Sequence, residues 1–498
     1  MPTTLQHLET LPVYQQAGSG LLTDLYQLTM MYGYFKNQTM DKKAVFDLFF
    51  RVNPSGNGYV LAAGLEQVIL YLHQLRFTNV EIDYLRTLDR FDEDFLRELE
   101  NFRFTGTLYA VPEGTPVFPF EPILRVEGRI FELQLIESAL LCFINHQSLI
   151  ATKAARMVQA TKGLFIDETH SISEFGLRRA QNESAAVFGA RAAYLGGCTN
   201  TSNVAAGMNF AIPVSGTQAH SWIQSFESER EAFEAYVNVY PNRAILLVDT
   251  YDVLASGVIN AIAVGKKLRE QGYDLLGVRI DSGDLAYLSK ETRKLLDAAG
   301  FEHTQIIVSD DLDEDTIRDL HLQGAPIDGY GVGTALITSK DWPALGCVYK
   351  LCAIEKEDEC IPTIKVSENP IKITNPGKKK VVRFYVDGIA SADLIMLDEE
   401  KLPTVEPVTL FDPVHTYKQK TLTTYTAKEL LVPIFTSGQL VYSLPTLEEI
   451  RKYAQKQLGT LSRETLRQKN PHTYHVDLSY SLFDLKRKLV EKMRTNHQ

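Results

Sequence analysis

The sequence contains few cysteines, and their number and spacing exclude two kinds of site. Among its 498 residues there are five cysteines, none of them in a Cys-x-x-Cys pair. An odd number without that spacing indicates neither a disulfide framework nor a zinc site. We therefore expect a protein of the reducing cytoplasm.

Long apolar runs are missing as well. No stretch of 18 apolar residues occurs, and the polar lead over residues 1–20 has no basic start followed by an apolar segment. Such features mark membrane-spanning helices and export signals. We therefore expect no membrane partner and no export by that route.

Positive charge is in deficit. Lys and Arg number 51 against 62 Asp and Glu, which gives a net charge of −11. This balance opposes a broad surface for nucleic acid or anionic lipid, because such surfaces are basic. A local basic pocket for a small phosphorylated ligand remains compatible with it.

What the chain does contain is enough apolar material for two or three domains, since 45% of its residues are hydrophobic. Residues 21–130 are expected to form an α+β domain. Its first helix is expected to begin at the capping residue Thr23 and to continue with helical apolar spacing. Further strands are expected at 44–50, 105–111 and 122–127, and a further helix at 61–75.

From residue 131 to residue 345 the pattern changes to alternating strands and helices. After a long helical segment, short strands that are apolar on both faces alternate with amphipathic helices, which is typical of a parallel sheet. So many units in succession favour an α/β barrel, whose active site lies at the carboxyl ends of its strands. The expected strands are 164–167, 244–249, 275–281, 305–310 and 327–333. Polar residues gather at or just beyond these ends: Glu174, Arg178, His220, Asp249, Arg279, Asp281, Asp310 and Thr334.

Residues 346–440 are expected to return to the sheet domain, with short strands at 348–354, 363–366 and 381–386. The last part, residues 441–498, is expected to be a helical segment. Its helical patterns cover 446–457 and 479–493 and carry mixed charges, which is typical of a solvated face.

A single histidine lies among residue types that suit a phosphate, in Ser215-Gly216-Thr217-Gln218-Ala219-His220-Ser221-Trp222. Glycine permits close approach of the backbone to a ligand, and the hydroxyls supply hydrogen bonds. An imidazole can either move a proton or accept a phosphoryl group. The alternative interpretation is a capped helix start with a buried histidine.

Two more segments follow strands directly. In Asp281-Ser282-Gly283-Asp284 the backbone amides can hold an anion, while the carboxylates can meet ribose hydroxyls or a magnesium-bound phosphate. Arg279 shares the strand face of Asp281, so a salt-bridged strand end is the alternative. The glycine turn Gly329-Tyr330-Gly331-Val332-Gly333-Thr334 suits a phosphate but lacks the Gly-x-Gly-x-x-Gly spacing of dinucleotide folds.

Taken together and in order, six motifs resemble those of nicotinate phosphoribosyltransferases, over about residues 20 to 440. They are Leu22-Thr23-Asp24-Leu25-Tyr26, Glu174-Phe175-Gly176-Leu177-Arg178-Arg179-Ala180, Thr201-Ser202-Asn203-Val204, Gly216-Thr217-Gln218-Ala219-His220-Ser221, Val278-Arg279-Ile280-Asp281-Ser282-Gly283-Asp284 and Gly331-Val332-Gly333-Thr334. The resemblance implies an irregular α/β barrel of the type II phosphoribosyltransferase kind, with an α+β domain built from N-terminal and C-terminal segments. It also implies a homodimer and the first step of NAD salvage from nicotinate.

The resemblance further implies the reaction and its residues. Nicotinate, phosphoribosyl pyrophosphate, ATP and water would give nicotinate mononucleotide, pyrophosphate, ADP and phosphate, with His220 as a phosphohistidine. Magnesium would sit on the leaving group, but no metal ligands are assigned. The implied nicotinate contacts are Tyr26, Phe175, Thr217 and Arg279, with Tyr26 contributed by the second subunit. The implied phosphoribosyl pyrophosphate contacts are Arg178, Asp281, Ser282, Gly283, Asp310, Gly331, Gly333 and Thr334.

Three alternative interpretations account for part of these motifs. The nicotinamide-using relative shares the fold and the histidine, but it has an acidic residue at roughly the position of Asn203, so the acid substrate is favoured here. A non-catalytic nucleotide-binding or extracellular signalling protein with this fold predicts loss of site residues, and none of the matched positions is lost. The Rossmann-like phosphoribosyltransferases are rejected, because the strand ending at Asp249 lacks their second acid and their Thr-Gly-Gly-Thr loop.

Overall fold

The computed structural model describes residues 4–14, 18–161, 170–357, 359–402 and 407–495. They form two compact units, one combining Met1–Leu149 with Ala344–Gln498 and the other comprising Ile150–Pro343. The first unit is thus built from both ends of the chain. The boundaries expected at residues 20, 130, 345 and 440 remain predictions about which segments fold independently.

The second unit is organised around a six-stranded sheet in which all neighbouring strands are parallel. The strand order is β7-β6-β11-β10-β9-β8. The strands are β6 (Ser171–Glu174), β7 (Asn200–Thr201), β8 (Ile245–Leu247), β9 (Gly277–Ile280), β10 (Gln305–Asp310) and β11 (Gly329–Val332). Within this sheet, β11 is the last strand along the chain and β6 the first, and the two pair directly.

The segment after residue 210 spans the remaining opening between β7 and β8. Val214 forms a parallel bridge with Thr201, and Nε2 of Gln218 donates a hydrogen bond to the carbonyl oxygen of Ile245 at 3.2 Å. The barrel is therefore closed by a loop segment rather than by a full strand. This arrangement confirms the irregular α/β barrel that the sequence predicts.

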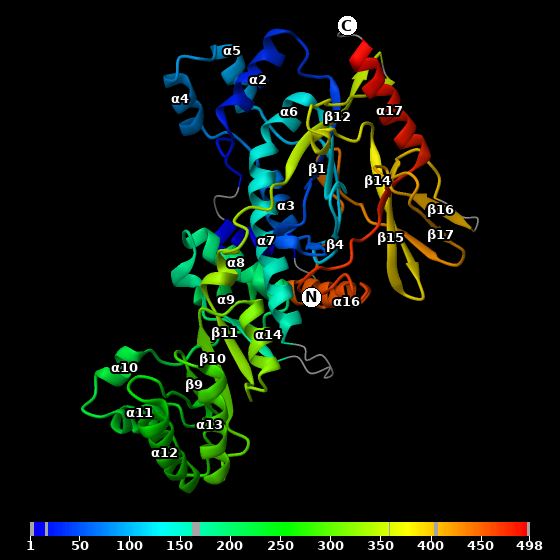
Figure 1. The fold of residues 1–498 in the computed structure, drawn as a ribbon. Coiled ribbons are helices and arrows are strands. Elements are labelled where there is room, and N and C mark those ends of the chain that lie inside the picture. The colour runs from blue at the N-terminus through cyan, green and yellow to red at the C-terminus, as the bar shows by residue number, and fades with distance from the viewer. Residues whose placement is uncertain (1–3, 15–17, 162–169, 358, 403–406, 496–498) are drawn as a thin grey trace. The chain divides into compact units, whose positions relative to one another are not determined.

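Helices with hydrogen-bonded caps connect the barrel strands. A side-chain oxygen of Ser228, Asp284 or Asp313 accepts a hydrogen bond from a backbone N–H in the first turn of α11, α13 or α14. Figure 1 shows α11, α12 and α13 in green, with α12 packed between the other two. The helices of this unit are α8 (Glu183–Leu195), α9 (Val204–Phe210), α10 (His220–Gln224), α11 (Glu229–Val239), α12 (Val258–Glu270), α13 (Leu285–Ala298), α14 (Glu314–Leu322) and α15 (Thr334–Ile337).

The first unit contains an antiparallel sheet of seven strands. The order is β13-β12-β1-β5-β3-β19-β20, so β1 from the N-terminal part lies between β5 and β12, which is drawn in yellow in Figure 1. The strands are β1 (Lys43–Phe49), β3 (Thr107–Ala110), β5 (Leu124–Arg129), β12 (Val348–Lys356), β13 (Glu359–Pro362), β19 (Val432–Thr436) and β20 (Gln439–Leu440). The sheet therefore joins strands from both ends of the chain.

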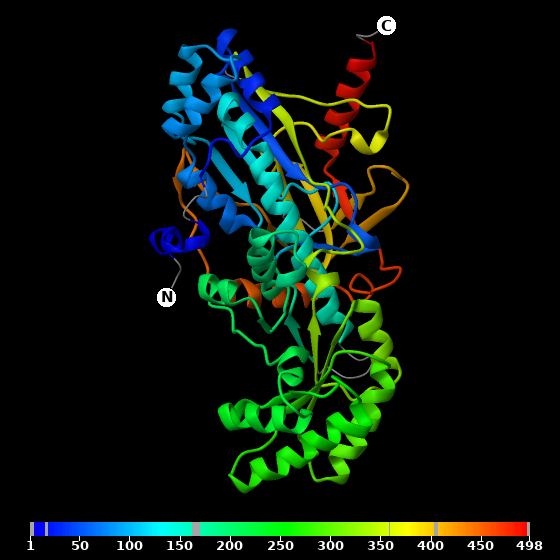
Figure 2. The same cartoon turned by 90° about the vertical axis from the view of Figure 1, so that its left-hand side faces the viewer.

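A smaller sheet in the same unit has the order β18-β14-β15-β21. Its carboxyl-terminal helix α17 (Tyr480–Thr495), the red helix in Figure 2, packs on β15. The strands are β14 (Lys379–Val386), β15 (Ile389–Leu397), β18 (Thr426–Glu429) and β21 (Val476–Leu478), and two strand pairs join β2 (Val60–Leu61) to β4 (Pro116–Val117) and β16 (Val408–Phe411) to β17 (Gln419–Leu422). The other helices are α1 (Leu5–Thr10), α2 (Leu25–Lys36), α3 (Leu65–Gln74), α4 (Asn79–Thr87), α5 (Glu93–Glu100), α6 (Ile130–Leu135), α7 (Glu137–Ala160) and α16 (Leu447–Leu458).

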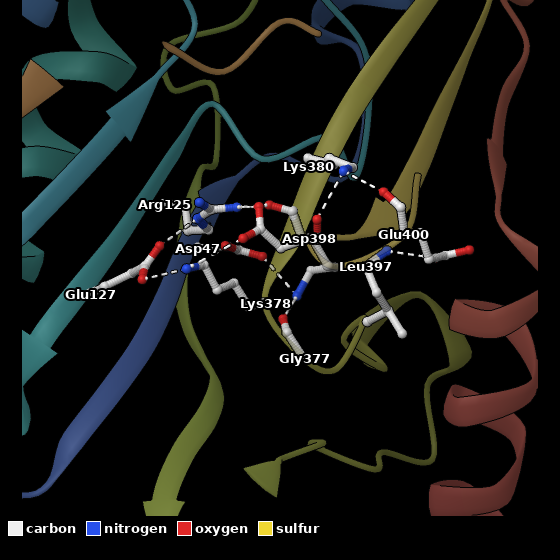
Figure 3. A network of polar contacts seen from close by, with 10 residues as sticks. Asp47, Arg125, Glu127, Gly377, Lys378, Lys380, Leu397, Asp398 and Glu400 are labelled. Atoms are coloured by element: carbon white, nitrogen blue, oxygen red, sulfur yellow. Dashed lines mark hydrogen bonds and ion pairs between the residues drawn. The ribbon is translucent and has the colours of Figure 1, made fainter. Parts of the chain in front are cut away.

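A network of charged groups ties the two ends of the chain together inside this unit (Figure 3). The guanidinium of Arg125 on β5 lies 2.8 Å from Asp398, just after β15, and 2.9 Å from Glu127. Next to it the buried ammonium of Lys379 on β14 lies 2.9 Å from the buried carboxylate of Asp47 on β1. Removing one partner of such a buried pair leaves an uncompensated charge, which costs about 3–5 kcal/mol. These pairs therefore fix the C-terminal strands to the N-terminal sheet.

The local predictions from sequence hold for most strands and fail at two places in the part of the chain that the structure describes. The strand expected at 164–167 lies outside the described residues and stays a prediction. Residues 363–366 are not a strand, because the backbone N–H of Lys365 is bound by the hydroxyl of Thr374 at 3.1 Å instead of by a neighbouring strand. The N-cap position of helix α2 is Asp24, which makes no capping hydrogen bond with its side chain, and not Thr23, whose hydroxyl donates to the carbonyl oxygen of Leu135 at 3.0 Å.

Candidate active site

A pocket with a volume of about 180 Å³, open to solvent, lies at the carboxyl ends of the barrel strands. Because β6, β9, β10 and β11 are parallel, the residues at and beyond their ends meet at one edge of the sheet. The pocket is lined by Phe175, Arg178, Arg179, Arg279, Asp281, Ser309, Asp310, Asp311, Gly331, Gly333 and Thr334.

Most of the residues predicted from sequence come together here. The pocket lining includes the predicted residues Phe175, Arg178, Arg279, Asp281, Asp310, Gly331, Gly333 and Thr334. His220 and Ser282 are linked to it through Asp249, as described below, and Thr217 and Gly283 lie in the same two loops. Tyr26 belongs to the other unit, on α2. The pocket also contains Arg179, Ser309 and Asp311, to which the sequence prediction gave no site role.

Arg279 and Asp281 form an ion pair within the pocket. Nη2 of Arg279 lies 3.0 Å from Oδ1 of Asp281, and Nε donates to the hydroxyl of Ser309 at 2.8 Å. The same hydroxyl donates to Oδ1 of Asp281. Partial burial alone would raise the pKa of Asp281, but the hydrogen bond from Ser309 and the charge of Arg279 lower it below its ordinary value. Asp281 is therefore a carboxylate at neutral pH.

Phe175 presents an aromatic face beside this arginine. The guanidinium carbon of Arg279 lies 5.9 Å from the centre of the Phe175 ring. The ring fits only because residue 331 is glycine, since a Cβ there would lie 2.6 Å from ring atoms of Phe175. A flat ligand that carries a negative charge would find both a ring face and a cation in this corner.

A buried carboxyl group stabilises the loop that contains Phe175. Glu174, at the end of β6, accepts hydrogen bonds from the backbone N–H of Gly176 and from the hydroxyl of Thr201, the latter at 2.6 Å. Burial raises the pKa of Glu174, and the two hydrogen bonds oppose that shift only in part. Glu174 was recognised in the sequence as a strand-end residue, and its contacts indicate that it positions the turn.

His220 is paired with an acid that the sequence prediction placed at a strand end without giving it a role. Nε2 of His220 lies 3.1 Å from Oδ1 of Asp249, whose side chain is only 1% exposed. The second oxygen of Asp249 accepts from the backbone N–H of Asp281 at 3.1 Å and from the hydroxyl of Ser282 at 2.6 Å. One buried carboxylate thus fixes both the histidine and the loop after β9. The signal in the sequence was the acid that ends the apolar segment Ala244 to Asp249.

Several buried polar atoms in and near the histidine loop have no hydrogen-bond partner among the described residues. They include Oγ1 of Thr217, Oε1 of Gln218 and Nδ2 of Asn203. A buried polar group without a partner costs about 1–3 kcal/mol, so such atoms are typical of sites that a ligand completes. Thr217 is one of the residues predicted to contact the ligand.

The described residues contain no group of three or more His, Cys, Asp or Glu side chains that could hold a metal ion by themselves. In the pocket the acidic residues are Asp281, Asp310 and Asp311. Magnesium is commonly bound through one or two carboxylates together with substrate phosphates and water. This donor set fits a magnesium ion that enters with a phosphorylated ligand.

None of the helices in the described part of the chain is both long enough and apolar enough to span a membrane.

Three family models match the chain in order. Residues 21–145 match the nicotinate phosphoribosyltransferase (NAPRTase) N-terminal domain, residues 170–393 the nicotinate phosphoribosyltransferase (NAPRTase) family and residues 378–486 the nicotinate phosphoribosyltransferase C-terminal domain. A curated relative, nicotinate phosphoribosyltransferase of Bacillus subtilis (strain 168), is 46% identical over 95% of this chain and 96% of its own.

Solved structures agree with the sequence matches. The crystal structure of human nicotinic acid phosphoribosyltransferase has a TM-score of 0.82 and 32% identity, and the match covers 94% of this chain and 100% of that one. Nicotinate-nucleotide pyrophosphorylase from Pyrococcus furiosus shares the fold, with a TM-score of 0.66 at 24% identity, over 89% of this chain and 95% of its own. With a relative this similar over nearly the whole of both chains, the protein belongs to the nicotinate phosphoribosyltransferase family.

Proposed function

We propose that this protein transfers the phosphoribosyl group of phosphoribosyl pyrophosphate to nicotinate, coupled to ATP hydrolysis. Nicotinate, phosphoribosyl pyrophosphate, ATP and water give nicotinate mononucleotide, pyrophosphate, ADP and phosphate. The single observation that carries the proposal is the pocket corner where Arg279 and the ring of Phe175 lie beside the glycine turn of β11. It offers a cation and a ring face for a pyridine carboxylate, next to a turn suited to a phosphorylated sugar.

Nicotinate binding follows from the charges of this corner. The guanidinium of Arg279 pairs two N–H groups with the carboxylate, and Phe175 packs against the pyridine ring. Asn203 is buried and neutral, so it adds no repulsion to a negatively charged ligand. An amide ligand would offer Arg279 one acceptor instead of two. The acid is therefore favoured over nicotinamide.

The sugar phosphate is assigned to the neighbouring strand ends. Arg178, Gly331, Gly333 and Thr334 line the pocket and supply a cation, open backbone and a hydroxyl for phosphate oxygens. Asp281 and Asp310 are placed to accept hydrogen bonds from the ribose hydroxyls. The loop of Ser282 and Gly283 begins α13, where Gly283 has a φ of +87° that suits glycine.

The bond change itself requires positioning more than proton transfer. The pyridine nitrogen has a free lone pair, so it attacks C1 of the ribose directly while the bond from C1 to the pyrophosphate oxygen breaks. Positive charge develops on the ribose, and the carboxylates of Asp281 and Asp310 stabilise it. A magnesium ion bound through Asp310 or Asp311 would neutralise charge on the departing pyrophosphate.

His220 is assigned as the group that accepts the γ-phosphoryl of ATP. Asp249 can accept a hydrogen bond from Nε2–H of the ring, which keeps the ring proton on Nε2 and leaves the lone pair on Nδ1 as the nucleophile. Attack by Nδ1 on the γ-phosphorus releases ADP, and water later releases phosphate from the ring. The contacts of Asp249 with Asp281 and Ser282 connect this step to the sugar-binding loop.

We also propose that the protein works as a homodimer with shared sites and that Tyr26 reaches the pocket of the partner subunit. The support is the exposure of apolar side chains at the start of α2: Tyr26 is 51% exposed, and Leu22, Leu25 and Met30 are exposed beside it in the sequence. Exposed apolar patches of this kind mark interaction sites. A cytoplasmic location is proposed because the sequence has an odd number of cysteines, five, and no Cys-x-x-Cys pair.

The proposal is tested by measuring mononucleotide formation from nicotinate and from nicotinamide, each with and without ATP. We expect turnover of nicotinate with phosphoribosyl pyrophosphate, raised by ATP, and at least tenfold weaker use of nicotinamide because a charge-assisted contact is lost. Equal use of both pyridines would contradict the assignment of Arg279. A rate that ATP does not change would contradict the role of His220.

A further inference from the structure

Ser309 lies at the centre of the pocket's charged corner and has no role in the mechanism above. It is the next-to-last residue of β10, its side chain is among the pocket lining, and it is only 4% exposed. Its hydroxyl accepts a hydrogen bond from Nε of Arg279 at 2.8 Å and donates one to Oδ1 of Asp281. A serine hydroxyl has one proton, so this direction is fixed by the charges on either side.

These contacts determine which edge of the guanidinium is free. Arg279 has five N–H groups in a planar fork with two edges that can bind a carboxylate, one made by Nε and Nη2 and the other by Nη1 and Nη2. Ser309 occupies Nε and Asp281 occupies Nη2 on the first edge, with Nη2 at 3.0 Å from Oδ1. Among the residues that the structure describes, Nη1 has only a long contact, 3.5 Å, to the carbonyl oxygen of Gln218. The second edge is therefore the one left for a ligand carboxylate.

The hydroxyl also keeps Asp281 from taking both positions on the first edge. Without it, the carboxylate of Asp281 could pair with Nε and Nη2 together, which is the preferred geometry of an arginine and a carboxylate. Such a pair would turn the plane of the guanidinium. Ser309 takes the Nε position itself and leaves Asp281 only the contact with Nη2 at 3.0 Å, so the carboxylate is held to one position on this edge.

Packing around Ser309 leaves the hydroxyl little freedom. A Cβ on Gly331 would lie 3.2 Å from the Cβ of Ser309, so the neighbouring strand passes close to this side chain. Alanine and cysteine add no branched atom at this position, so both fit the same space. They can therefore separate the effect of the hydroxyl from the effect of packing.

We propose that Ser309 is a positioning residue that holds Arg279 with its Nη1–Nη2 edge towards the carboxylate of the pyridine substrate, and so sets the preference for the acid. The inference rests on the proposed function. It predicts an effect that acts through Arg279 and falls on the pyridine substrate. Asp281 keeps its contact with Nη2, so phosphoribosyl pyrophosphate is affected less.

The test compares the wild type with Ser309→Ala and Ser309→Cys, measuring KM for each substrate and kcat. We expect KM for nicotinate to rise about tenfold in both variants, because a thiol is a weak donor and acceptor. KM for phosphoribosyl pyrophosphate should change about twofold or less.

Ser289→Ala is the matched control. Ser289 is also buried in this unit, on α13, and its hydroxyl donates to the carbonyl oxygen of Ala286 at 3.2 Å. Its KM values should equal those of the wild type, with a melting temperature lowered about as much as in Ser309→Ala.

A double variant decides whether Ser309 acts through Arg279. Arg279→Gln combined with Ser309→Ala should be no weaker towards nicotinate than Arg279→Gln alone, because a positioning residue has nothing left to position. Additive losses would overturn the inference, as would equal rises in KM for both substrates or wild-type kinetics in Ser309→Cys. If the wild type does not use nicotinate at all, the proposed function fails and this inference falls with it. Turnover by the wild type with unchanged KM in Ser309→Ala would overturn the inference alone.

Discussion

At the scale of single residues, the contact between Asp249 and His220 favours one tautomer of the imidazole ring. A buried carboxylate at 3.1 Å from Nε2 keeps the proton on that nitrogen and leaves Nδ1 free to attack a phosphoryl group. In Asp249→Asn the amide can donate to Nε2, which moves the ring proton to Nδ1. We therefore expect ATP-dependent labelling of His220 and stimulation of turnover by ATP to fall about ten- to a hundredfold, the usual range for a lost charged hydrogen bond.

The measurement is the amount of acid-labile label from γ-labelled ATP, with His220→Asn as the unlabelled reference. Asp252→Asn is the matched control, because Asp252 lies three residues further on and caps the next short helix through hydrogen bonds that asparagine can also make. It should be labelled like the wild type. Full labelling of Asp249→Asn would show that the carboxylate does not control the tautomer.

The pocket residues that could be predicted from the sequence are those that lie at the ends of predicted strands. Arg279, Asp281 and Asp310 follow apolar segments, and parallel strands bring such positions to one edge. The roles of Asp249 and Ser309 were not predictable, because each depends on hydrogen-bond partners contributed by other strands or loops. A single sequence states which residues end a strand but not which strand lies next to it.

At the scale of elements, the short strand β21 contains a buried aspartate, Asp477, and burial disfavours its charged form. Asp477 is 2% exposed and pairs with Leu394 of β15 in the sheet register. Burial, with a smaller contribution from Asp412, raises the pKa of Asp477 to about 6, and Lys420 opposes the shift. The folded protein therefore binds this proton more tightly than the unfolded chain does.

The sign of the pH dependence follows from that difference. Above about pH 6 the buried carboxylate is charged and opposes folding, and between pH 6 and 4 it takes up a proton and the cost disappears. Asp477→Asn should therefore stabilise the protein by about 1–3 kcal/mol at pH 7.5 and by little near pH 4. Thermal unfolding of both proteins across this pH range measures the difference.

An exposed acid in the same unit provides the comparison. Asp89 is exposed and has a φ of +50°, a conformation that asparagine tolerates, so Asp89→Asn is the control for replacing an acid by its amide. A gain in Asp477→Asn that is the same at pH 4 and pH 7.5 would mean that packing or hydrogen bonding, and not the charge, is responsible.

Elements were most predictable where every face is buried. The strands β8 to β11 appear in the sequence as apolar segments because both of their faces lie under other parts of the barrel. Strand β15 was missed, since it contains the buried Asp393, whose charge is balanced by Arg383 on β14 at 2.6 Å. The pattern of residues 363–366 suggested a strand, but the backbone N–H of Thr363 binds the carbonyl oxygen of Cys352 on β12 and the segment is not continued as a strand.

At the scale of the whole molecule, the sequence predicted that the C-terminal part returns to the N-terminal domain, but it did not predict which strands become neighbours in the sheet. The order of the seven-stranded sheet places β12 beside β1 and β19 beside β3. Charge pairs such as Lys379 with Asp47 help to set that arrangement, and these partners are far apart in the sequence. Fitting a strand into a sheet depends on long-range complementarity that periodicity does not record.

The proposed assembly is the remaining question at this scale, and Tyr26 is the residue that tests it. Tyr26 lies on the exposed start of α2, in the unit that does not contain the pocket. If it completes the site of the partner subunit, a two-fold dimer exchanges this residue reciprocally. Each working site then takes His220 from one chain and Tyr26 from the other.

Two inactive variants should therefore restore each other. Tyr26→Ala and His220→Ala are each expected to be nearly inactive as homodimers in the ATP-coupled assay. In a mixed dimer one site collects both changes and the other has none, so refolding the two variants together in equal amounts should give about a quarter of the wild-type activity, since half of the dimers are mixed and each has one intact site. Each variant refolded alone is the control, and the mixed dimer is verified with two different affinity tags. Absence of activity in verified mixed dimers would place Tyr26 and His220 of one site on the same chain. In that case one pocket of each mixed dimer would carry Tyr26→Ala and the other His220→Ala, so neither pocket would be intact.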